Sequence, residues 1–560
     1  MNHLMKRGTK CLLVHPFVSA LSFWNYPEVC KLVDAKYPAA PLGLATVAGL
    51  LPQQWEFKLV DLNVEPLRDD HLDWADIVCT GGMLPQQRSI LSIIDHAHAR
   101  RRLVAVGGAD ITSQPSIYQS ADFVVEGEGE VTIPMFLADL ERGSKSGQYK
   151  SSELADMRNT VVPRFDLVDF KNYLHAGVQF SRGCPFNCEF CDIIELFGRY
   201  PRAKTADQVI AELQSLYDLG YRGHIDLVDD NLIGNKRALK TVLPAVKDWS
   251  EKHRYPFYYS TQASANLADD DELLQMMRDI DFRYVFVGFE TPDDSILIQT
   301  QKKQNLSRDI PAVARKIYSY GIILTAGYVL GFDAENATTH QLIIQAIRDS
   351  GTPMVMFGML YALPNTQLAA RLKREGRLFG EHAILSGENP EIDQTTGNLN
   401  YIPRRPIVEV LKDYITVIGS IYDPAEYYRR VRFTALKLRI DYLYKPRLRR
   451  LLLNLKAFVR ICRRAGFNRT TGVQFWKTLL IVLLRNPKAL EASTNLSAMF
   501  IHFYQHTLYN IDLRRQKIAS IESEGEQAYN ARMFALFADA RATQAPMSPR
   551  GTAVYEESPK

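Results

Sequence analysis

Short apolar runs alternate with amphipathic segments from Lys10 to about Gly143. The runs have the length of buried strands, and the segments between them have the period of helices. Strands that alternate with helices build a parallel sheet covered on both faces. The pattern predicts a doubly wound, Rossmann-like α/β domain over residues 1–150. Its expected strands are 11–14, 57–61, 77–80, 103–106 and 123–125, and its expected helices are 43–51, 87–101 and 131–140.

Glycines and acidic residues follow three of these strands. Sheets of this class bind ligands at the carboxyl ends of their strands, and glycine lets the backbone approach a flat ligand or a phosphate. None of the loops is a G-x-G-x-x-G fingerprint, which weakens a nicotinamide-binding interpretation. The alternative is that these glycines only form turns. The candidate binding residues at this edge are Thr80, Gly81, Gly107, Gly108, Glu126 and Gly127.

A second series of alternating strands and helices follows a predicted linker at 151–172. Over 173–400 the expected strands are 178–181, 224–228, 257–261, 284–289, 323–330 and 354–360. Six consecutive β/α units predict a partial (β/α)6 barrel, with chemistry at the carboxyl ends of its strands. Polar residues follow these strands, although Asp, Ser and Asn also serve as helix caps. The candidates on this rim are Asp229, Asp230, Asn231, Ser264 and Glu290.

The last third of the chain changes character to helices rich in Arg, Leu, Phe and Tyr. We expect a helical domain over 401–540 and a disordered tail over 541–560, where Pro, Ser and Gly recur. Residues 442–490 contain no Asp or Glu, while Lys and Arg recur and Trp476 lies among Leu and Phe. This composition is typical of a helix at a membrane surface. The alternative is a solvated cationic face over an ordinary helical bundle.

Composition narrows the class of protein. A chain of 560 residues is long enough for several domains, and a net charge of +4 is too small to indicate a nucleic-acid partner. The first ten residues are polar and basic, and no apolar run reaches the roughly 18 residues that span a bilayer. We therefore expect a cytoplasmic protein, with residues 442–490 as its contact with the inner membrane surface. Seven cysteines do not suggest a disulfide framework.

Cys184, Cys188 and Cys191 form a C-x3-C-x2-C pattern directly after an apolar run. Three thiolates at this spacing can hold three irons of a cubane cluster and leave the fourth iron without a protein ligand. The alternative is a zinc site, which needs a fourth ligand at short spacing. His175 and His224 form no such pair. The pattern therefore favours an iron–sulfur cluster with an open iron. No Ser-His-Asp order, H-E-x-x-H motif or P-loop lysine stands out.

This spacing, with Phe190 just before the third cysteine, resembles the radical S-adenosylmethionine (radical-SAM) superfamily. Segments 180–202, 228–235 and 22–24 are similar to the subgroup that contains the bacterial hopanoid A-ring (C-2) methylase. The N-terminal domain resembles the cobalamin-binding domain of that family. The resemblance implies a [4Fe-4S] cluster held by the three cysteines, SAM on the open iron near Phe190, and cobalamin on the N-terminal domain. The D-x-H-x-x-G motif is absent, so histidine from it is not the lower ligand of the cobalt.

The resemblance also implies a reaction. The cluster would cleave one SAM to a 5'-deoxyadenosyl radical, and the methyl group of a second SAM would reach an unactivated carbon through methylcobalamin. The expected substrate is a polycyclic lipid of the hopanoid class, and the expected electron donor is a low-potential flavodoxin or ferredoxin.

Three alternatives stay open at this stage. The first is a radical-SAM enzyme that couples, cyclises or otherwise rearranges a lipid or a secondary metabolite without methyl transfer. The second attaches methylthio groups to RNA or protein, but that class usually carries three further cysteines for a second cluster, which the scattered remaining thiols do not supply. The third is a membrane-surface scaffold with a structural cluster.

Overall fold

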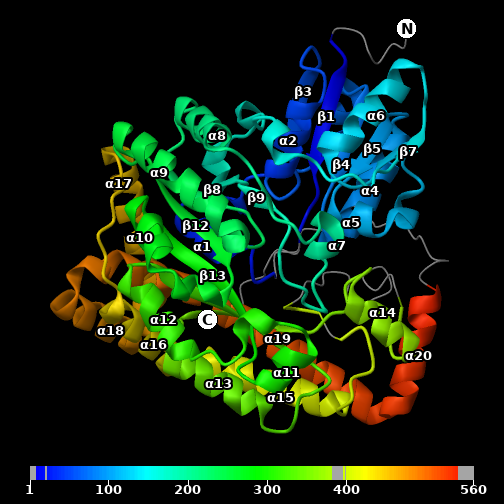
Figure 1. Cartoon of the computed structure of the whole chain (residues 1–560). Helices are drawn as coiled ribbons and strands as arrows, with labels where there is room; N and C mark the ends of the chain where they lie inside the picture. Colours follow the sequence, from blue (N-terminus) through cyan, green and yellow to red (C-terminus); the bar gives the residue numbers. More distant parts are fainter. Residues whose placement is uncertain (1–7, 19–21, 381–394, 398, 540–560) are drawn as a thin grey trace.

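Two parallel sheets and a layer of C-terminal helices make up the protein (Figure 1). The structure is a computed structural model, and it describes residues 8–18, 22–380, 395–397 and 399–539. The first sheet has the strand order β3-β1-β4-β5-β6-β7, and every pair in it is parallel. Its strands are β1 (Lys10–His15), β3 (Glu56–Asp61), β4 (Ile77–Gly81), β5 (Leu103–Gly107), β6 (Phe123–Val125) and β7 (Gly147–Tyr149).

Both faces of this sheet are buried, which explains the continuous apolar runs in the sequence. Along β1, Leu12 and Val14 join one apolar cluster, whereas Cys11 and Leu13 join the cluster on the opposite face. Helix α4 covers the first face, and α2 and α6 cover the second. The predicted doubly wound domain is therefore confirmed. The helices of this region are α2 (Leu42–Leu50), α3 (Asp69–Trp74), α4 (Gln87–Ala99), α5 (Ala109–Ser113) and α6 (Gly129–Glu141), whereas α1 (Pro27–Leu32) contacts the second sheet and the C-terminal helices.

The second sheet is a partial barrel with the strand order β15-β14-β13-β12-β11-β8-β2. All of its pairs are parallel, and β15 and β2 are its two free edges. Six of its strands correspond to the predicted units. They are β8 (Tyr173–Val178), β11 (Gly223–Leu227), β12 (Phe257–Ala263), β13 (Phe282–Glu290), β14 (Ile323–Leu330) and β15 (Met354–Met359).

The helices of the barrel follow the expected order along the chain. Three further helices lie in loops at the carboxyl ends of the strands, namely α7 (Ile193–Phe197), α11 (Asp294–Gln299) and α14 (Gln367–Arg374). The outer helices are α8 (Ala206–Asp218), α9 (Lys236–Lys252), α10 (Asp271–Asp279), α12 (Ile310–Ser319) and α13 (Thr339–Ser350).

The seventh strand of this sheet comes from the N-terminal region. Strand β2 (Tyr37–Ala39) pairs with β8, with Tyr37 opposite Tyr173 and Ala39 opposite His175. The chain thus leaves the first sheet after β1, adds an edge strand to the second sheet, and returns. The sequence pattern did not predict this strand, because three residues are too few to show a period.

The strand before the cysteine motif differs from the prediction of 178–181. Strand β8 ends at Val178, where its pairing with β11 ends. The backbone N–H groups of Phe180 and Ser181 then donate to the Asp229 carboxylate instead of to a neighbouring strand. A side chain therefore ends the ladder. Ser181–Arg182 forms a short strand, β9, that pairs with β10 (Arg202–Ala203).

The C-terminal helices pack on the barrel and share its apolar core. Among the described residues, every helix is too short or too polar to span a bilayer. The predicted tail, 541–560, lies outside the described residues. The helices are α15 (Ile407–Ile421), α16 (Pro424–Lys437), α17 (Leu448–Ile461), α18 (Gly472–Arg485), α19 (Leu490–Glu524) and α20 (Glu526–Asp539).

Candidate active site

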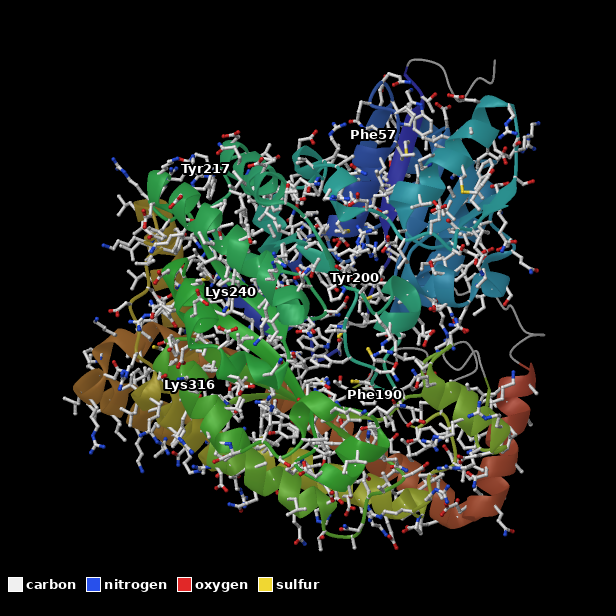
Figure 2. The ribbon with its side chains drawn as sticks, in the orientation of Figure 1. Phe57, Phe190, Tyr200, Tyr217, Lys240 and Lys316 are labelled. Atoms are coloured by element: carbon white, nitrogen blue, oxygen red, sulfur yellow. The ribbon has the colours of Figure 1, made fainter. Side chains whose placement is uncertain are left out.

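The three cysteines lie on one loop between β9 and α7. Cys188 is buried, and Cys184 and Cys191 are partly buried. Gly183 precedes the loop with φ +94°, and a Cβ atom there would lie 2.9 Å from the carbonyl oxygen of Gly198. That carbonyl accepts a hydrogen bond from the Cys184 N–H. Figure 2 labels Phe190 within the loop and Tyr200 just beyond α7, both in the central part of the view. Only glycine fits the turn that brings the end of α7 back onto the loop.

Asp229 holds the start of this loop in place. Its carboxylate accepts hydrogen bonds from the N–H groups of Phe180 (2.9 Å) and Ser181 (2.5 Å), and from the Ser181 hydroxyl. Burial raises the pKa of Asp229 to about 6, although these hydrogen bonds act in the opposite direction. Since both oxygens are occupied by the protein, Asp229 acts here as a positioning residue for the cysteine loop. Its contact with a cofactor stays a prediction.

Two side-chain amides point at the thiols. Asn231 Nδ2 donates to Cys184 Sγ over 3.8 Å, and Gln304 Nε2 donates to Cys188 Sγ over 3.5 Å. Asn231 is fixed in turn, because its Oδ1 accepts from the N–H and the hydroxyl of Ser264. Burial raises the pKa of both the Cys188 and Cys191 thiols. Amide donors favour the thiolate form, so they oppose that effect and suit cluster ligands.

A buried ion pair lies beside the same thiols. Lys302 Nζ is 2.7 Å from Glu290 Oε1 and 5.7 Å from the centre of the Phe190 ring. Burial acts to lower the pKa of Lys302, but the Glu290 carboxylate and the Cys188 thiol raise it well above its ordinary value. The ammonium is therefore charged and next to Cys188. Phe190 also packs against Phe332, with ring centres 5.8 Å apart.

Asp230 lies next to this cluster in the sequence but is differently placed. It is exposed. The protein around it restricts the hydration of its carboxylate and raises its pKa to about 7, and the carboxylates of Asp229 and Asp192 add to the effect. A carboxyl group with this pKa exchanges a proton near neutral pH.

The donors of the loop fit an iron–sulfur cluster. Three thiols lie on one loop, and two of them accept hydrogen bonds from side-chain amides. Hydrogen bonds to the sulfurs are among the factors that set the potential of such clusters. A structural zinc site normally takes a second Cys or His pair at short spacing, which the motif lacks.

The candidates of the N-terminal sheet gather at the carboxyl ends of β4, β5 and β6. A Cβ atom on Gly81 would lie 1.9 Å from the Gly107 carbonyl oxygen, so these two strands need glycine to pack. Gly108 has φ +109° and begins α5. The Thr80 hydroxyl donates to the Val14 carbonyl, so this side chain bonds within the sheet. The glycines thus serve the sheet and also leave its edge free of side chains.

Glu126 and Gly127 belong to the loop after β6. Glu126 is buried, and its Oε1 accepts from Gln148 Nε2 while its Oε2 lies 3.3 Å from Lys150 Nζ. The Gly127 N–H donates to the Thr112 hydroxyl, and its φ is +85°. This loop is therefore tied to α5. Met83, which follows β4 at the same edge, is apolar and 59% exposed. Its side chain could contact a large apolar ligand there.

The two groups of candidates face each other. Helix α5, which follows Gly108, packs against α7, which follows Cys191, and Figure 1 draws these helices side by side. Arg182 pairs with Glu130 through two hydrogen bonds of 2.8 and 2.9 Å, and Arg202 pairs with Glu128 through bonds of 2.6 and 2.8 Å. Ion pairs therefore join the start of α6 to β9 and β10, the two short strands beside the cysteine loop.

Sequence reasoning missed several of these residues. Lys302, Gln304, Arg182 and Arg202 gave no signal of their own, because their partners are distant in the sequence. The alternating Glu-Gly-Glu-Gly-Glu of 126–130 was the available clue. Two of its three carboxylates pair with arginines of the barrel, which a binding loop alone would not require.

The chain matches the Radical SAM superfamily over residues 178–343 and a domain of unknown function (DUF4070) over 366–512. It is 42% identical to an uncharacterized methyltransferase of Synechocystis sp. over 499 residues, which cover 89% of this chain and 92% of the relative. It is 32% identical to the hopanoid C-2 methylase of Rhodopseudomonas palustris over 460 residues, which cover 80% of this chain and 84% of the relative.

Solved structures share the fold at low sequence identity. The cobalamin-dependent S-adenosylmethionine radical enzyme OxsB superposes with a TM-score of 0.57 at 13% identity, covering 95% of this chain and 84% of that one. The radical S-adenosylmethionine methyltransferase TsrM from Kitasatospora setae gives 0.52 at 15% identity, covering 66% and 78%. The resemblance inferred from the motifs is confirmed. The chain belongs to the radical-SAM superfamily, in the group of methyltransferases that includes the hopanoid C-2 methylase.

Proposed function

We propose that this protein transfers a methyl group from SAM to an unactivated carbon of a polycyclic lipid, a hopanoid. The observation that carries the proposal is the 32% identity to the hopanoid C-2 methylase along 84% of that enzyme. The cysteine loop supports it, because its thiols and amide donors suit an iron–sulfur cluster. When bound, the cluster, SAM and cobalamin supply one-electron chemistry, which a carbon without an acidic proton or a leaving group requires.

The barrel rim would hold the cluster and SAM. In this proposal Cys184, Cys188 and Cys191 are the cluster ligands. Asn231 and Gln304 stabilise two of the thiolates by hydrogen bonds. The Glu290–Lys302 pair places a fixed charge of each sign beside them. Among the predicted SAM contacts, Asp229 already bonds to Phe180 and Ser181, and Asn231 and Ser264 bond to each other. Phe190, Asp230 and Glu290 stay candidates for direct contact.

The N-terminal sheet would hold cobalamin at its carboxyl edge. Gly81, Gly107 and Gly108 leave that edge without side chains, and exposed Met83 offers an apolar surface beside it. Thr80, Glu126 and Gly127 shape the backbone there. The contact of α5 with α7 brings this edge next to the cysteine loop, which a transfer between the two sites needs. A low-potential flavodoxin or ferredoxin would supply electrons, and residues 442–490 would contact the inner membrane surface.

The rival function is radical coupling, cyclisation or rearrangement without methyl transfer. The two functions differ in their products, because only methyl transfer converts one SAM to S-adenosylhomocysteine for each turnover. The test is anaerobic incubation of the reduced, cobalamin-loaded protein with SAM and a hopanoid. We expect 5'-deoxyadenosine and S-adenosylhomocysteine in equal amounts. 5'-Deoxyadenosine with a changed lipid and without S-adenosylhomocysteine would establish the rival.

Replacing any one of Cys184, Cys188 and Cys191 by Ala should reduce SAM cleavage to background, because two thiolates do not hold the cluster. Cys462→Ala is the matched control, since this cysteine is partly buried in the C-terminal helices, away from the loop. 5'-Deoxyadenosine is measured by mass spectrometry and iron by colorimetry. Cleavage that survives in any of the three loop variants would remove the cluster assignment.

A further inference from the structure

Exposed apolar side chains gather on one segment of the chain. Of the large apolar side chains that are exposed in the described structure, twelve lie between Leu448 and Leu484, on α17, α18 and the turn between them. We call these side chains the apolar ledge. Soluble proteins expose single apolar residues at scattered positions, whereas a contiguous group marks a surface that binds something. Four residues of the ledge, Leu448, Phe467, Val473 and Leu484, are each more than 70% exposed.

Helix α18 shows the feature most clearly, because it is apolar on two faces. Phe475, Leu479 and Val482 are buried against the protein. Val473, Trp476, Leu480 and Leu483 follow one another at spacings of three and four residues and are all exposed. Residues at these spacings share one face of a helix. A surface helix of a soluble protein normally turns charged residues to the solvent, so the outer face of α18 is suited to an apolar environment.

The turn before α18 holds an aromatic residue in a fixed position. Trp476 Nε1 donates to the Gly466 carbonyl over 3.0 Å, and a Cβ atom on Gly466 would lie 2.9 Å from the indole ring. Phe467 packs edge-on against the same indole, with ring centres 6.2 Å apart, and is itself 77% exposed. The indole is thus ordered by the protein although 43% of it is exposed. Tryptophan is the residue that prefers the boundary between water and lipid.

Charge selects the occupant of this surface. Residues 442–490 contain no Asp or Glu. Some of their cations dock α17 on the N-terminal region, as in the pairs Arg460–Asp34 and Arg464–Glu28. Others, including Arg463, Arg469 and Lys477, are exposed around the ledge. A second copy of the chain would bring like charges together across the contact. An anionic bilayer offers the opposite charge and attracts basic residues near its surface.

We propose that the apolar ledge docks the enzyme on the surface of an anionic bilayer, with α17 and α18 in the headgroup region. The helices lie on the membrane and do not cross it. Figure 1 draws both at the edge of the molecule away from the first sheet, so docking leaves the N-terminal domain clear of the lipid. Docking would place the enzyme at the surface from which a polycyclic lipid is taken. This last step rests on the proposed function.

The test is sedimentation of the cobalamin-loaded, full-length protein with vesicles. Phosphatidylcholine vesicles are compared with vesicles that also contain phosphatidylglycerol, at low and high salt. We expect binding to the anionic vesicles that weakens as salt rises. The double variant Leu480→Asp, Leu483→Asp should lose at least about tenfold in binding, because two charges would enter the apolar boundary. The control is Leu508→Asp, a residue of α19 with 51% exposure outside the ledge, and it should bind like the wild type.

A second measurement does not depend on whether the double variant folds. Brominated lipids should quench the fluorescence of the wild type, and the quenching should disappear in Trp476→Phe. Equal binding by the wild type and the double variant would overturn the docking, and so would a wild-type dimer in solution that Leu480→Asp dissolves. The two proposals fail separately. Vesicle binding without 5'-deoxyadenosine would remove the proposed function, and cleavage of SAM without vesicle binding would remove the docking.

Discussion

Single side chains decide the chemistry that each thiol of the cysteine loop can perform. Cys188 is buried, which disfavours its thiolate. Gln304 donates to its sulfur, and the charged Lys302 lies beside it. Both effects stabilise negative charge on sulfur. Iron–sulfur ligation needs that charge, and the potential of a cluster depends on hydrogen bonds to its sulfurs and on the surrounding charge. The same neighbours should therefore set how readily the bound cluster is reduced.

Gln304→Leu tests this effect. The substitution removes the N–H donor to Cys188 and keeps the side chain close in size. We expect a more negative reduction potential, because the thiolate keeps more of its charge, and about a tenfold loss of SAM cleavage. The potential is measured by redox titration followed by electron paramagnetic resonance.

The matched control for this variant is Gln275→Leu, an exposed glutamine of α10 whose amide donates to Asp279. It should leave the potential unchanged. An unchanged potential in Gln304→Leu would show that this hydrogen bond has no part in tuning the cluster.

The cysteines could be predicted from the sequence because their ligand spacing is local. Lys302 and Gln304 could not, since they follow β13 by a dozen residues or more and come next to Cys188 only when the barrel has folded. Asp229 was expected as a binding residue, and the structure shows its oxygens bonded to the loop that it positions. A single sequence does not distinguish a polar residue that contacts a ligand from one that holds a loop.

At the scale of elements, close contact between two strands shapes the edge of the first sheet. Gly81 of β4 and Gly107 of β5 lie opposite each other, and their backbones approach too closely for a side chain. The positions of five of the six strands of this sheet followed from the sequence, because strands buried on both faces read as continuous apolar runs, whereas β7 was not predicted. Strand β2 and the end of β8 did not follow from it either, since each is decided by a partner far along the chain.

Gly81→Val should separate β4 from β5, because its Cβ atom alone would lie 1.9 Å from the Gly107 carbonyl oxygen. We expect a destabilisation of about 1–3 kcal/mol or more, together with loss of bound cobalamin. Scanning calorimetry reports the first effect, and the visible absorption of the purified protein reports the second.

Gly43→Ala is the control for this change. Nothing lies within 4 Å of a Cβ atom at Gly43, which belongs to α2, so alanine should be neutral or slightly stabilising there. Wild-type cobalamin content in Gly81→Val would mean that the edge of the first sheet does not bind the cofactor.

At the scale of the whole molecule, two arginines of the barrel fix the N-terminal sheet against the cysteine loop. The Arg202–Glu128 and Arg182–Glu130 pairs are nearly buried, with the Glu128 side chain 2% exposed. Buried pairs of this kind define a geometry more than they add stability. They hold together the two edges that a methyl transfer between sites would use.

Arg202→Met should loosen this arrangement, because it removes the bidentate partner of the buried Glu128 carboxylate and leaves Arg182, at 3.9 Å, as its cation, at a cost of up to about 3–5 kcal/mol. We expect the N-terminal domain to unfold separately, as a second transition in scanning calorimetry. Arg142→Met is the control, since Arg142 is exposed and bonds to Asp139 and to the Ala138 carbonyl on the same domain. It should change stability by less than about 0.5 kcal/mol. A single, unshifted transition in Arg202→Met would contradict the role given to this pair.

The measurement that tests the central claim most directly is mass spectrometry of lipids from a hopanoid-producing host that lacks its own methylase. The host is grown with cobalamin, with and without this protein, and with methyl-labelled methionine. The account predicts a hopanoid heavier by one methyl substitution that carries the label and is absent when Cys188 is replaced by Ala. Unchanged hopanoids, in cells whose purified protein still forms 5'-deoxyadenosine from SAM, would contradict the assigned substrate.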